Sequence, residues 1–578
     1  MQSQSLNLSA SRPLAFRLRP ETKHLIIMIA VSAAIMTPTL VWGIPSNRDL
    51  SNHFRFELPF YDALRAGYLS PGWLSESNQG FGDASFRFYP PALYYVLALA
   101  RATTGSWYAA TVLTFAALSS LGALGVYLWA REFGSSQMAM LAGILYSLAP
   151  YRLNQFFQAS MLAEFAGASV LPFAFAFTSR VCRDGGKKNI AGLATSYALL
   201  VLTHLPLAVI GSLALAVYAL LCIDKKRRAA TLGSLTLSAA IGLAASACYW
   251  TTMIVELNWI RADNINPEPS VDYRNNFVLS SFSPDSINVW WMNILLLSSI
   301  AMFWPALALL FKTANPIGPS LSDIRKPIKT MSIVLLLTIF MATPLSQPLW
   351  RVVHPLQQTQ FPWRWFSITS IVCPILLALA FPFWKRLARS RKRPVFLIAL
   401  GTVALSLAFS VSHIVREAQW LTRAEFEQTL NSIPGTQSVS QWLPVWVHEP
   451  LPNMSALVET ADRQLTIKSW EPQRRVFQVS AGPAIDARVR TFFYPYWKAS
   501  ADDRELAVHP DPSGTLVVAL PTEASTVTLE FREPARVRYA TGLTILGWGL
   551  IGGLWFKPRK SAIKLTIPGT VTFQTLDD

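Results

Sequence analysis

Residues 48–53, Arg-Asp-Leu-Ser-Asn-His, begin a polar segment directly after an apolar run that ends near Trp42. Further along, the same segment contains Gly80-Phe81-Gly82 and the aromatic, proline-locked turn Phe88-Tyr89-Pro90-Pro91. The chain leaves the apolar run through a segment with ionisable side chains, and at the aromatic turn it enters the next apolar stretch. This pattern predicts a loop at the surface of a membrane, between parts of an integral membrane protein.

The composition also favours a membrane protein. Of 578 residues, 52% are hydrophobic and only 14% are charged, which is too apolar for a soluble protein of this size. The net charge of +17 could indicate nucleic-acid binding. However, the basic residues fall in short clusters between apolar runs, as in the cytoplasmic loops of membrane proteins. We therefore expect the lipid bilayer, and no nucleic acid, as a partner. The four cysteines have no metal-ligand spacing, so neither a disulfide framework nor a zinc site is expected.

Apolar runs predict about twelve membrane spans, at 25–43, 108–130, 137–150, 163–179, 189–204, 205–222, 230–250, 289–311, 329–343, 365–384, 395–413 and 537–556. With the N-terminus inside the cell, every strong basic cluster falls on the cytoplasmic side. The expected fold class is therefore a polytopic α-helical protein of the cytoplasmic (inner) membrane. Its domains would be a cytoplasmic tail 1–24, a transmembrane domain 25–413, an extracytoplasmic domain 414–536, a last span 537–556 and a cytoplasmic tail 557–578.

Two outer segments are too long to be simple connections. In the first outer loop, 44–107, apolar residues recur at helical spacing, which predicts helices lying at the interface. Pro59 should break or kink the first of these helices, and Pro90-Pro91 should begin a second over Ala92 to Ala100. Segment 425–536 instead alternates, as in Thr526 to Phe531 and Thr515 to Leu520, with a turn at Pro512-Ser513-Gly514. It predicts an antiparallel β domain of sandwich type.

Asp49 and His53 are the first candidate catalytic pair. A carboxylate just outside the membrane can act as a general base toward a hydroxyl group. Together with His53 it could instead hold a divalent metal ion against a phosphate. A solvated loop with a helix-capping aspartate explains the same spacing, so both interpretations stay open.

Glu164 and His204 are further candidates, each at the outer end of a predicted span. An acid in apolar surroundings usually faces a cavity or a partner, so Glu164 could serve catalysis or metal binding. A plain ion pair with Arg152 is the alternative. His204 could bind substrate at the same level, or could simply cap a helix.

Arg364, in Phe361-Pro362-Trp363-Arg364-Trp365, is a candidate for binding a lipid phosphate, because a guanidinium binds phosphate bidentately. Arg87 and its neighbour Tyr89 are a second such candidate. Interfacial anchoring would explain Arg364 equally well. All these residues map to one membrane face near span ends, whereas a transporter would place ionisable groups at the midplane.

The chain resembles the GT-C superfamily of membrane glycosyltransferases, which includes protein O-mannosyltransferases and aminoarabinose transferases. More narrowly, it resembles a bacterial membrane family labelled 6-pyruvoyl-tetrahydropterin-synthase-related. The stretches that carry this resemblance are Asp49 to His53, Gly80 to Pro91, Leu162-Ala163-Glu164, Thr203-His204-Leu205-Pro206, Phe361-Pro362-Trp363-Arg364 and Phe493-Tyr494-Pro495-Tyr496-Trp497-Lys498. The histidine-rich zinc site of the soluble pterin synthase is not recognisable, so the label does not imply pterin chemistry.

The superfamily resemblance implies a polyprenyl-phosphate sugar as donor and an inverting single displacement. It places the first-loop catalytic acid at Asp49 and a second outer-loop acid, which holds a metal or positions the acceptor, near Glu164. The chain departs from the pattern because no second acid adjoins Asp49, which leaves a divalent metal cofactor open. The acceptor would be an envelope glycan, lipid or protein. The alternative is a non-enzymatic membrane assembly or lipid-handling protein that uses its β domain for recognition.

Overall fold

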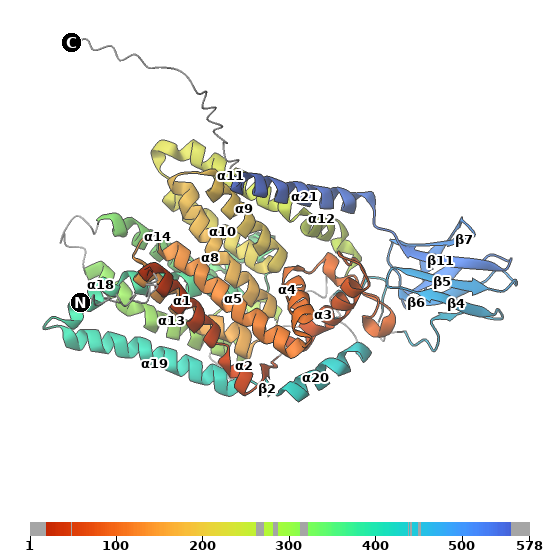
Figure 1. Ribbon diagram of the computed structural model, residues 1–578, viewed down its shortest axis with the longest axis horizontal. Helices are drawn as coiled ribbons and strands as arrows, with labels where there is room; N and C mark the ends of the chain where they lie inside the picture. The colour runs from red at the N-terminus through yellow and green to blue at the C-terminus, as the bar shows by residue number, and fades with distance from the viewer. Residues whose placement is uncertain are drawn as a thin grey trace, which may run out of the picture.

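The computed structural model describes residues 19–47, 49–261, 271–280, 287–312, 322–436, 439, 442–448 and 452–556. Arg48, residues 1–18 of the predicted N-terminal tail and the C-terminal tail 557–578 lie outside the described residues. Figure 1 shows a large helical part, with a β domain beyond one end and the helices α3 and α4 between them.

The helical part follows the apolar runs of the sequence. Its helices are α1 (Pro20–Ala34), α2 (Thr37–Val41), α5 (Trp107–Ala130), α6 (Ser136–Ser147), α8 (Leu162–Arg183), α9 (Lys187–Thr203), α10 (Leu205–Cys222), α11 (Arg228–Ala245), α12 (Ala247–Glu256), α13 (Ile287–Lys312), α14 (Ser322–Ala342), α17 (Phe366–Leu379), α18 (Phe381–Ala388), α19 (Arg393–Glu417) and α21 (Ala535–Trp555). Every predicted span coincides with one or two of these helices.

Fewer of the described helices are both long and apolar enough to cross a membrane than the twelve spans predicted from the sequence. Among the described residues, six helices are sufficiently long and apolar, or seven if a pair bent by 85° is one span. α6 has 12 residues and α9 has 17. At 1.5 Å per residue they measure about 18 and 26 Å, less than the hydrocarbon core of about 30 Å. The first predicted span is itself broken, because α1 ends at Ala34 and α2 begins at Thr37.

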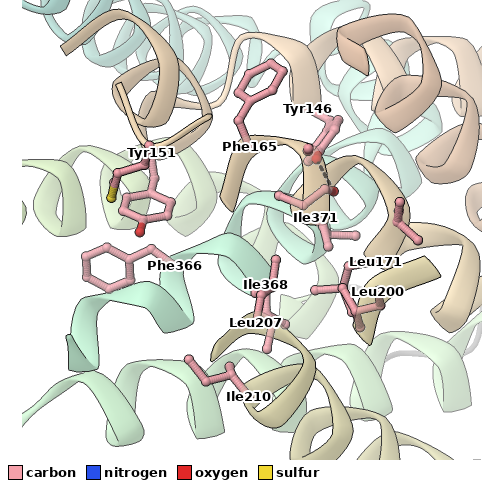
Figure 2. Close-up of a cluster of buried hydrophobic side chains, with 14 of the residues drawn as sticks. Tyr146, Tyr151, Phe165, Leu171, Leu200, Leu207, Ile210, Phe366, Ile368 and Ile371 are labelled. Atoms are coloured by element: carbon pink, nitrogen blue, oxygen red, sulfur yellow. Dashed lines mark hydrogen bonds between the residues drawn. The ribbon is translucent and has the colours of Figure 1, made fainter. Parts of the chain in front are cut away.

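The core of the helical part is built around α17. Every residue of this helix is buried, as expected for a helix that is apolar on all sides. Figure 2 shows Ile368 and Ile371 of α17 among side chains of α8, α9 and α10. Leu171, Leu200 and Leu207 from those three helices are fully buried. This packing fixes the start of α8, which carries Glu164, beside the start of α17, which directly follows Arg364.

The candidate Glu164 and basic residues lie at opposite ends of α8. α8 begins two residues before Glu164 and ends at Arg183. In the reverse direction, α19 begins at Arg393 and ends at Glu417. An outward-facing position for the candidates stays a prediction from the basic clusters of the sequence.

The end of the helical part that carries Glu164 has shorter elements, with α3 (Leu50–Arg65) and α4 (Ala92–Thr104) in the predicted first outer loop. The predicted second helix is therefore confirmed, whereas α3 continues through Pro59 without a break. The remaining outer helices are α7 (Pro150–Leu153), the π-helix η3 (Asn154–Gln158), α15 (Gln347–Val352), α16 (His354–Gln357), the 3₁₀ turn η11 (Pro362–Trp365) and α20 (Arg423–Ser432). Strand β1 (Ile44–Pro45) pairs with β2 (Trp420–Leu421), which ties the start of the loop to the end of α19.

The predicted β sandwich is present. One antiparallel sheet has the order β3-β6-β10-β9 and the other β4-β5-β11-β7-β8. The strands are β3 (Val458–Glu459), β4 (Leu465–Trp470), β5 (Arg474–Val479), β6 (Asp486–Phe492), β7 (Trp497–Ala501), β8 (Arg504–Leu506), β9 (Val508–Pro510), β10 (Thr515–Ala519) and β11 (Ser525–Phe531). The predicted turn before β10 is formed by Gly514 with a φ of +83°, where a side chain would meet the backbone of Trp446. Trp73 and Phe81 of the first outer loop belong to the sandwich core.

Candidate active site

Asp49 lies at the N-cap of α3 and lines a cavity of about 430 Å³. The other walls come from η3, from α13, from the segment before η11 and from the end of α19, with Asn154, Trp291, Phe361 and Glu417 among the lining residues. Asn52 donates to the Asp49 carboxylate at 3.5 Å. The cavity therefore presents the Asp49 carboxylate at the outer ends of several helices, with a second carboxylate from Glu417 in its wall.

His53 fastens α3 to α8. Its Nε2 accepts a hydrogen bond from the backbone N–H of Leu162 at 3.2 Å, so its proton belongs on Nδ1, 2.9 Å from the Tyr94 hydroxyl. Burial lowers the pKa of His53 to about 3, which keeps the ring neutral. Since both ring nitrogens are engaged, His53 holds the loop that carries Asp49 in place, and does not face a substrate.

Glu164 is paired with Arg364, not with Arg152. Arg364 Nε donates to Glu164 Oε2 at 3.0 Å, and the carboxylate is 1% exposed. Tyr151, Gln155 and Ser367 donate to Oε1 at 2.7–3.1 Å. Arg152 instead donates to the Phe165 carbonyl and the Ser169 hydroxyl.

Arg364 lies next to the cavity. Its Nη1 donates to the Thr359 carbonyl, and its guanidinium stacks 4.8 Å from the ring of the cavity residue Phe361. Among the described residues, its Nη2 has no acceptor. The Nε edge of the guanidinium is thus fixed by Glu164, while Nη2 keeps its hydrogen-bonding capacity.

Tyr89 and His204 both lie close enough to Arg364 to feel its charge. Burial raises the pKa of Tyr89, and the nearby Asp49 carboxylate raises it further, while Arg364 opposes this effect. Burial lowers the pKa of His204, and the Arg364 charge adds to that effect. His204 Nδ1 accepts from the Leu207 N–H at 3.2 Å, so it caps α10, as its alternative interpretation anticipated. Asp49, His53, Tyr89, Glu164, His204 and Arg364 therefore gather in one place.

Arg87 has a different environment. Its Nη2 lies 2.8 Å from Glu256 Oε1, and its Nη1 lies 2.6 Å from Glu533 Oε1. Tyr494 and Tyr496 of the sandwich also donate to Glu256, at 2.7 and 2.8 Å. The buried Arg87 guanidinium is thus neutralised by two carboxylates and joins the first outer loop, α12 and the β sandwich. This position gives it no free charge for a phosphate.

A shared metal site does not fit these residues. His53 uses both nitrogens, and Glu164 already accepts four hydrogen bonds, which leaves only Asp49 of the three metal candidates facing the cavity. Within the described part of the chain, no three His, Cys, Asp or Glu side chains are grouped as metal ligands. The three candidates therefore do not form a joint ligand set.

Sequence reasoning missed the amides that surround Asp49. Asn154 Nδ2 and Gln158 Oε1 are buried cavity atoms without a partner among the described residues. They lie on a π-helix, a feature that is frequent at functional sites but has no sequence signature. The run Asn154-Gln155-Phe156-Phe157-Gln158 could have drawn attention as an amide-rich outer loop. Glu256, an acid at the end of an apolar helix, would have been found by the reasoning applied to Glu164.

A model of the 6-pyruvoyl-tetrahydropterin synthase related domain, described as a membrane protein, matches residues 86–420, more than half of the chain. The chain belongs to this family. The narrower of the two resemblances is thereby confirmed. The matched segment contains Glu164, His204 and Arg364, but neither Asp49 nor the β sandwich. Comparison with curated proteins gives no match.

The chain is also similar to solved glycosyltransferase structures. They include the arabinofuranosyltransferase AftD from Mycobacteria (16% identity, TM-score 0.41, 69% of this chain and 27% of that one). ArnT from Cupriavidus metallidurans, bound to undecaprenyl phosphate, has 15% identity and a TM-score of 0.42 over 72% of this chain and 74% of that one. The arabinosyltransferase EmbB from Mycobacterium smegmatis has 12% identity and a TM-score of 0.41 over 90% of this chain and 64% of that one. The chain thus spans about a quarter of AftD, and similarity at this level assigns no role to any residue.

Proposed function

We propose that the protein is a membrane glycosyltransferase that moves a sugar from a polyprenyl-phosphate donor to an acceptor outside the cytoplasm. The observation that carries the proposal is the position of the Asp49 carboxylate, in a cavity at the outer helix ends beside the Glu164–Arg364 pair. The donor class follows the sequence resemblance to GT-C enzymes.

The reaction is a single displacement at the anomeric carbon. The Asp49 carboxylate takes the proton from an acceptor hydroxyl as that oxygen forms a bond to the anomeric carbon. The bond between the anomeric carbon and the phosphate oxygen breaks, and its electron pair leaves with the lipid phosphate. Attack from the face opposite the leaving group inverts the configuration of the sugar.

The surrounding residues act by positioning and by charge. Arg364, held by Glu164, directs Nη2 at the charge that develops on the departing phosphate. His53 keeps Asp49 at the cavity by fixing α3 to the first residue of α8. Asn154 and Gln158 offer a donor and an acceptor to sugar hydroxyls. The β sandwich, joined to the first outer loop through Arg87, would select the acceptor.

The proposal is tested by reconstituting the full chain in liposomes with radiolabelled polyprenyl-phosphate sugars and an envelope extract as acceptor. We expect label to move from the polyprenyl phosphate to an acceptor of the extract, in a product whose anomeric configuration is opposite to that of the donor. A product that retains the donor configuration would contradict the single displacement. Label that stays on the lipid with every donor would instead favour the non-enzymatic assembly hypothesis.

A further inference from the structure

A second cavity, of about 440 Å³, lies between the first outer loop and the β sandwich. Its walls come from α3, from residues 75–80, from residues 433–436 and from sandwich residues that include Trp470 and Arg490. This volume is within the range of about 300–1,000 Å³ that is typical of ligand sites. Neither the proposed reaction nor the family assignment gives this cavity a role.

The charged side chains of the wall balance each other. Arg55 and Arg490 contribute positive charge, and Asp62 and Glu76 contribute negative charge. These charges offer both donors and acceptors of hydrogen bonds without a net charge, so they suit a neutral ligand rich in hydroxyl groups. A phosphate would be repelled by the two carboxylates, and a polycation by the two guanidinium groups.

Buried polar atoms without a described partner gather at this cavity. They include the Ser77 hydroxyl, whose residue is 7% exposed, and the Nε atoms of Arg55 and Arg490. Pro59, which also lines the cavity, has no N–H for the carbonyl of Arg55 one helical turn earlier. Unsatisfied buried groups are costly in a protein interior, so their concentration here indicates a place where a polar ligand supplies partners.

The cavity also has an aromatic wall and a strained rim. The guanidinium of Arg475 covers the Trp470 ring at 4.5 Å, which fixes the indole that lines the cavity. Asn78 and Gln79, both in the wall, have φ values of +54° and +59°, and Gly80 follows at +89°. Such left-handed conformations outside glycine cost energy and are concentrated at functional sites. An indole beside hydrogen-bonding groups can cover the apolar face of a sugar ring.

We infer that this cavity binds uncharged saccharide units of the acceptor, an assignment that rests on the proposed function. The helix α3 carries both sites, with Asp49 at its N-cap and Arg55 and Asp62 further along. At 1.5 Å per residue, these two side chains originate about 9 and 20 Å along the helix from Asp49. At about 100° per residue, both side chains also lie on a different face of α3 from Asp49. An acceptor chain of a few sugar units in the second cavity would therefore pass around α3 to bring its end to the Asp49 carboxylate.

The test measures binding without any donor, so that it is independent of transfer. Short uncharged oligosaccharides of hexoses and pentoses are passed over the full-length protein, immobilised in lipid nanodiscs. We expect wild type to bind at least one of them. Asp62→Asn and Trp470→Ala should each weaken that binding about tenfold, a typical loss when a central contact is removed. Trp470→Phe, which keeps an aromatic ring beside Arg475, should retain most of it.

A control variant and a comparison of transfer separate this inference from the proposed reaction. Asp503→Asn, at an exposed turn of the sandwich, should bind like wild type. Absence of binding by wild type, binding of charged saccharides alone, or equal binding by the Asp62 and Trp470 variants would each overturn the inference. If the Asp62 and Trp470 variants transfer sugar normally while Asp49→Asn has lost transfer, the inference about the second cavity is overturned and the proposed function stands.

Discussion

Glu164 and Arg364 form a buried ion pair, with Arg364 Nε 3.0 Å from Glu164 Oε2, between residues 200 positions apart in the sequence. The carboxylate is satisfied further by Tyr151, Gln155 and Ser367. The pair joins the first turn of α8 to η11 at the edge of the Asp49 cavity. A charge pair that is this well hydrogen-bonded in the interior can fix the geometry of a site.

Removing one partner of this pair should be strongly destabilising. Arg364→Ala leaves the buried Glu164 charge uncompensated, at a cost of about 3–5 kcal/mol of unfolding free energy. Arg423→Ala is the matched control, because Arg423 forms an exposed pair with Glu427, and should cost about 0–1 kcal/mol. Denaturant unfolding in detergent measures both. Equal losses in the two variants would contradict a structural role for the Glu164 pair.

His53 should stay neutral in the folded protein well below the pH at which histidine normally titrates. Its folded pKa, about 3, lies below its ordinary value of 6.5. Stability contributed by the neutral ring is therefore complete above pH 6.5 and is lost as the pH falls toward 3, by up to about 1.4 kcal/mol per pH unit. NMR of the His53 ring, assigned by comparison with His53→Gln, should show the neutral form at pH 5. An imidazolium at that pH would contradict the hydrogen bond from Leu162.

Glu57 should respond to pH in the opposite direction. Both its carboxyl oxygens are buried without a hydrogen-bond partner among the described residues, and burial raises its pKa well above 4.5. The folded state thus holds a proton that the unfolded state releases above pH 4.5, so stability is lost as the pH rises from there. Glu57→Gln should be more stable than wild type at pH 7, by about 1 kcal/mol or more, and no more stable near pH 4. Melting curves at both pH values give the comparison, and a variant less stable at pH 7 would refute it.

The Arg87–Glu256 contact should hold the β sandwich against the first outer loop. Burial alone would raise the pKa of Glu256, but the hydrogen bonds from Arg87, Tyr494 and Tyr496 outweigh it and keep the pKa low. Arg87→Lys keeps the charge but loses the forked geometry, so it should increase hydrogen exchange in residues 81–88 and 492–497 nearly as much as Arg87→Ala. Arg532→Ala, which removes an exposed pair with Glu530, serves as the control. Unchanged exchange in Arg87→Ala would contradict the bridging role.

Elements whose signal is local could be predicted from the sequence. Apolar runs located the helices, alternation located β10 and β11, and Pro90-Pro91 marked the start of α4. Among the described residues, fewer helices than the predicted twelve are long and apolar enough for a full span, because apolar character does not reveal where a helix such as α6 ends. Pro59 was expected to break or kink α3, and the helix continues through it, with buried residues on both sides.

Partners far apart in sequence could not be predicted. Asp49, Glu164 and Arg364 were expected at one membrane face from span topology, and the structure brings them to one cavity edge. The role of Arg87 depends on Glu256, 169 residues away, and on Glu533. Likewise, the two hydrogen bonds that occupy His53 are made with the Tyr94 hydroxyl and with the backbone N–H of Leu162. The spacing of residues in the first outer loop does not reveal these hydrogen-bond partners of Arg87 and His53.

The most direct measurement is the rate of sugar transfer from a polyprenyl-phosphate donor by Asp49→Asn, compared with wild type and with Asp502→Asn, an exposed control. Asparagine preserves the shape of the cavity but cannot accept the proton of the acceptor hydroxyl. The account predicts transfer reduced at least about 100-fold in Asp49→Asn, with normal membrane insertion, and unchanged transfer in Asp502→Asn. Equal rates in Asp49→Asn and wild type would contradict the assignment of Asp49 as the catalytic base.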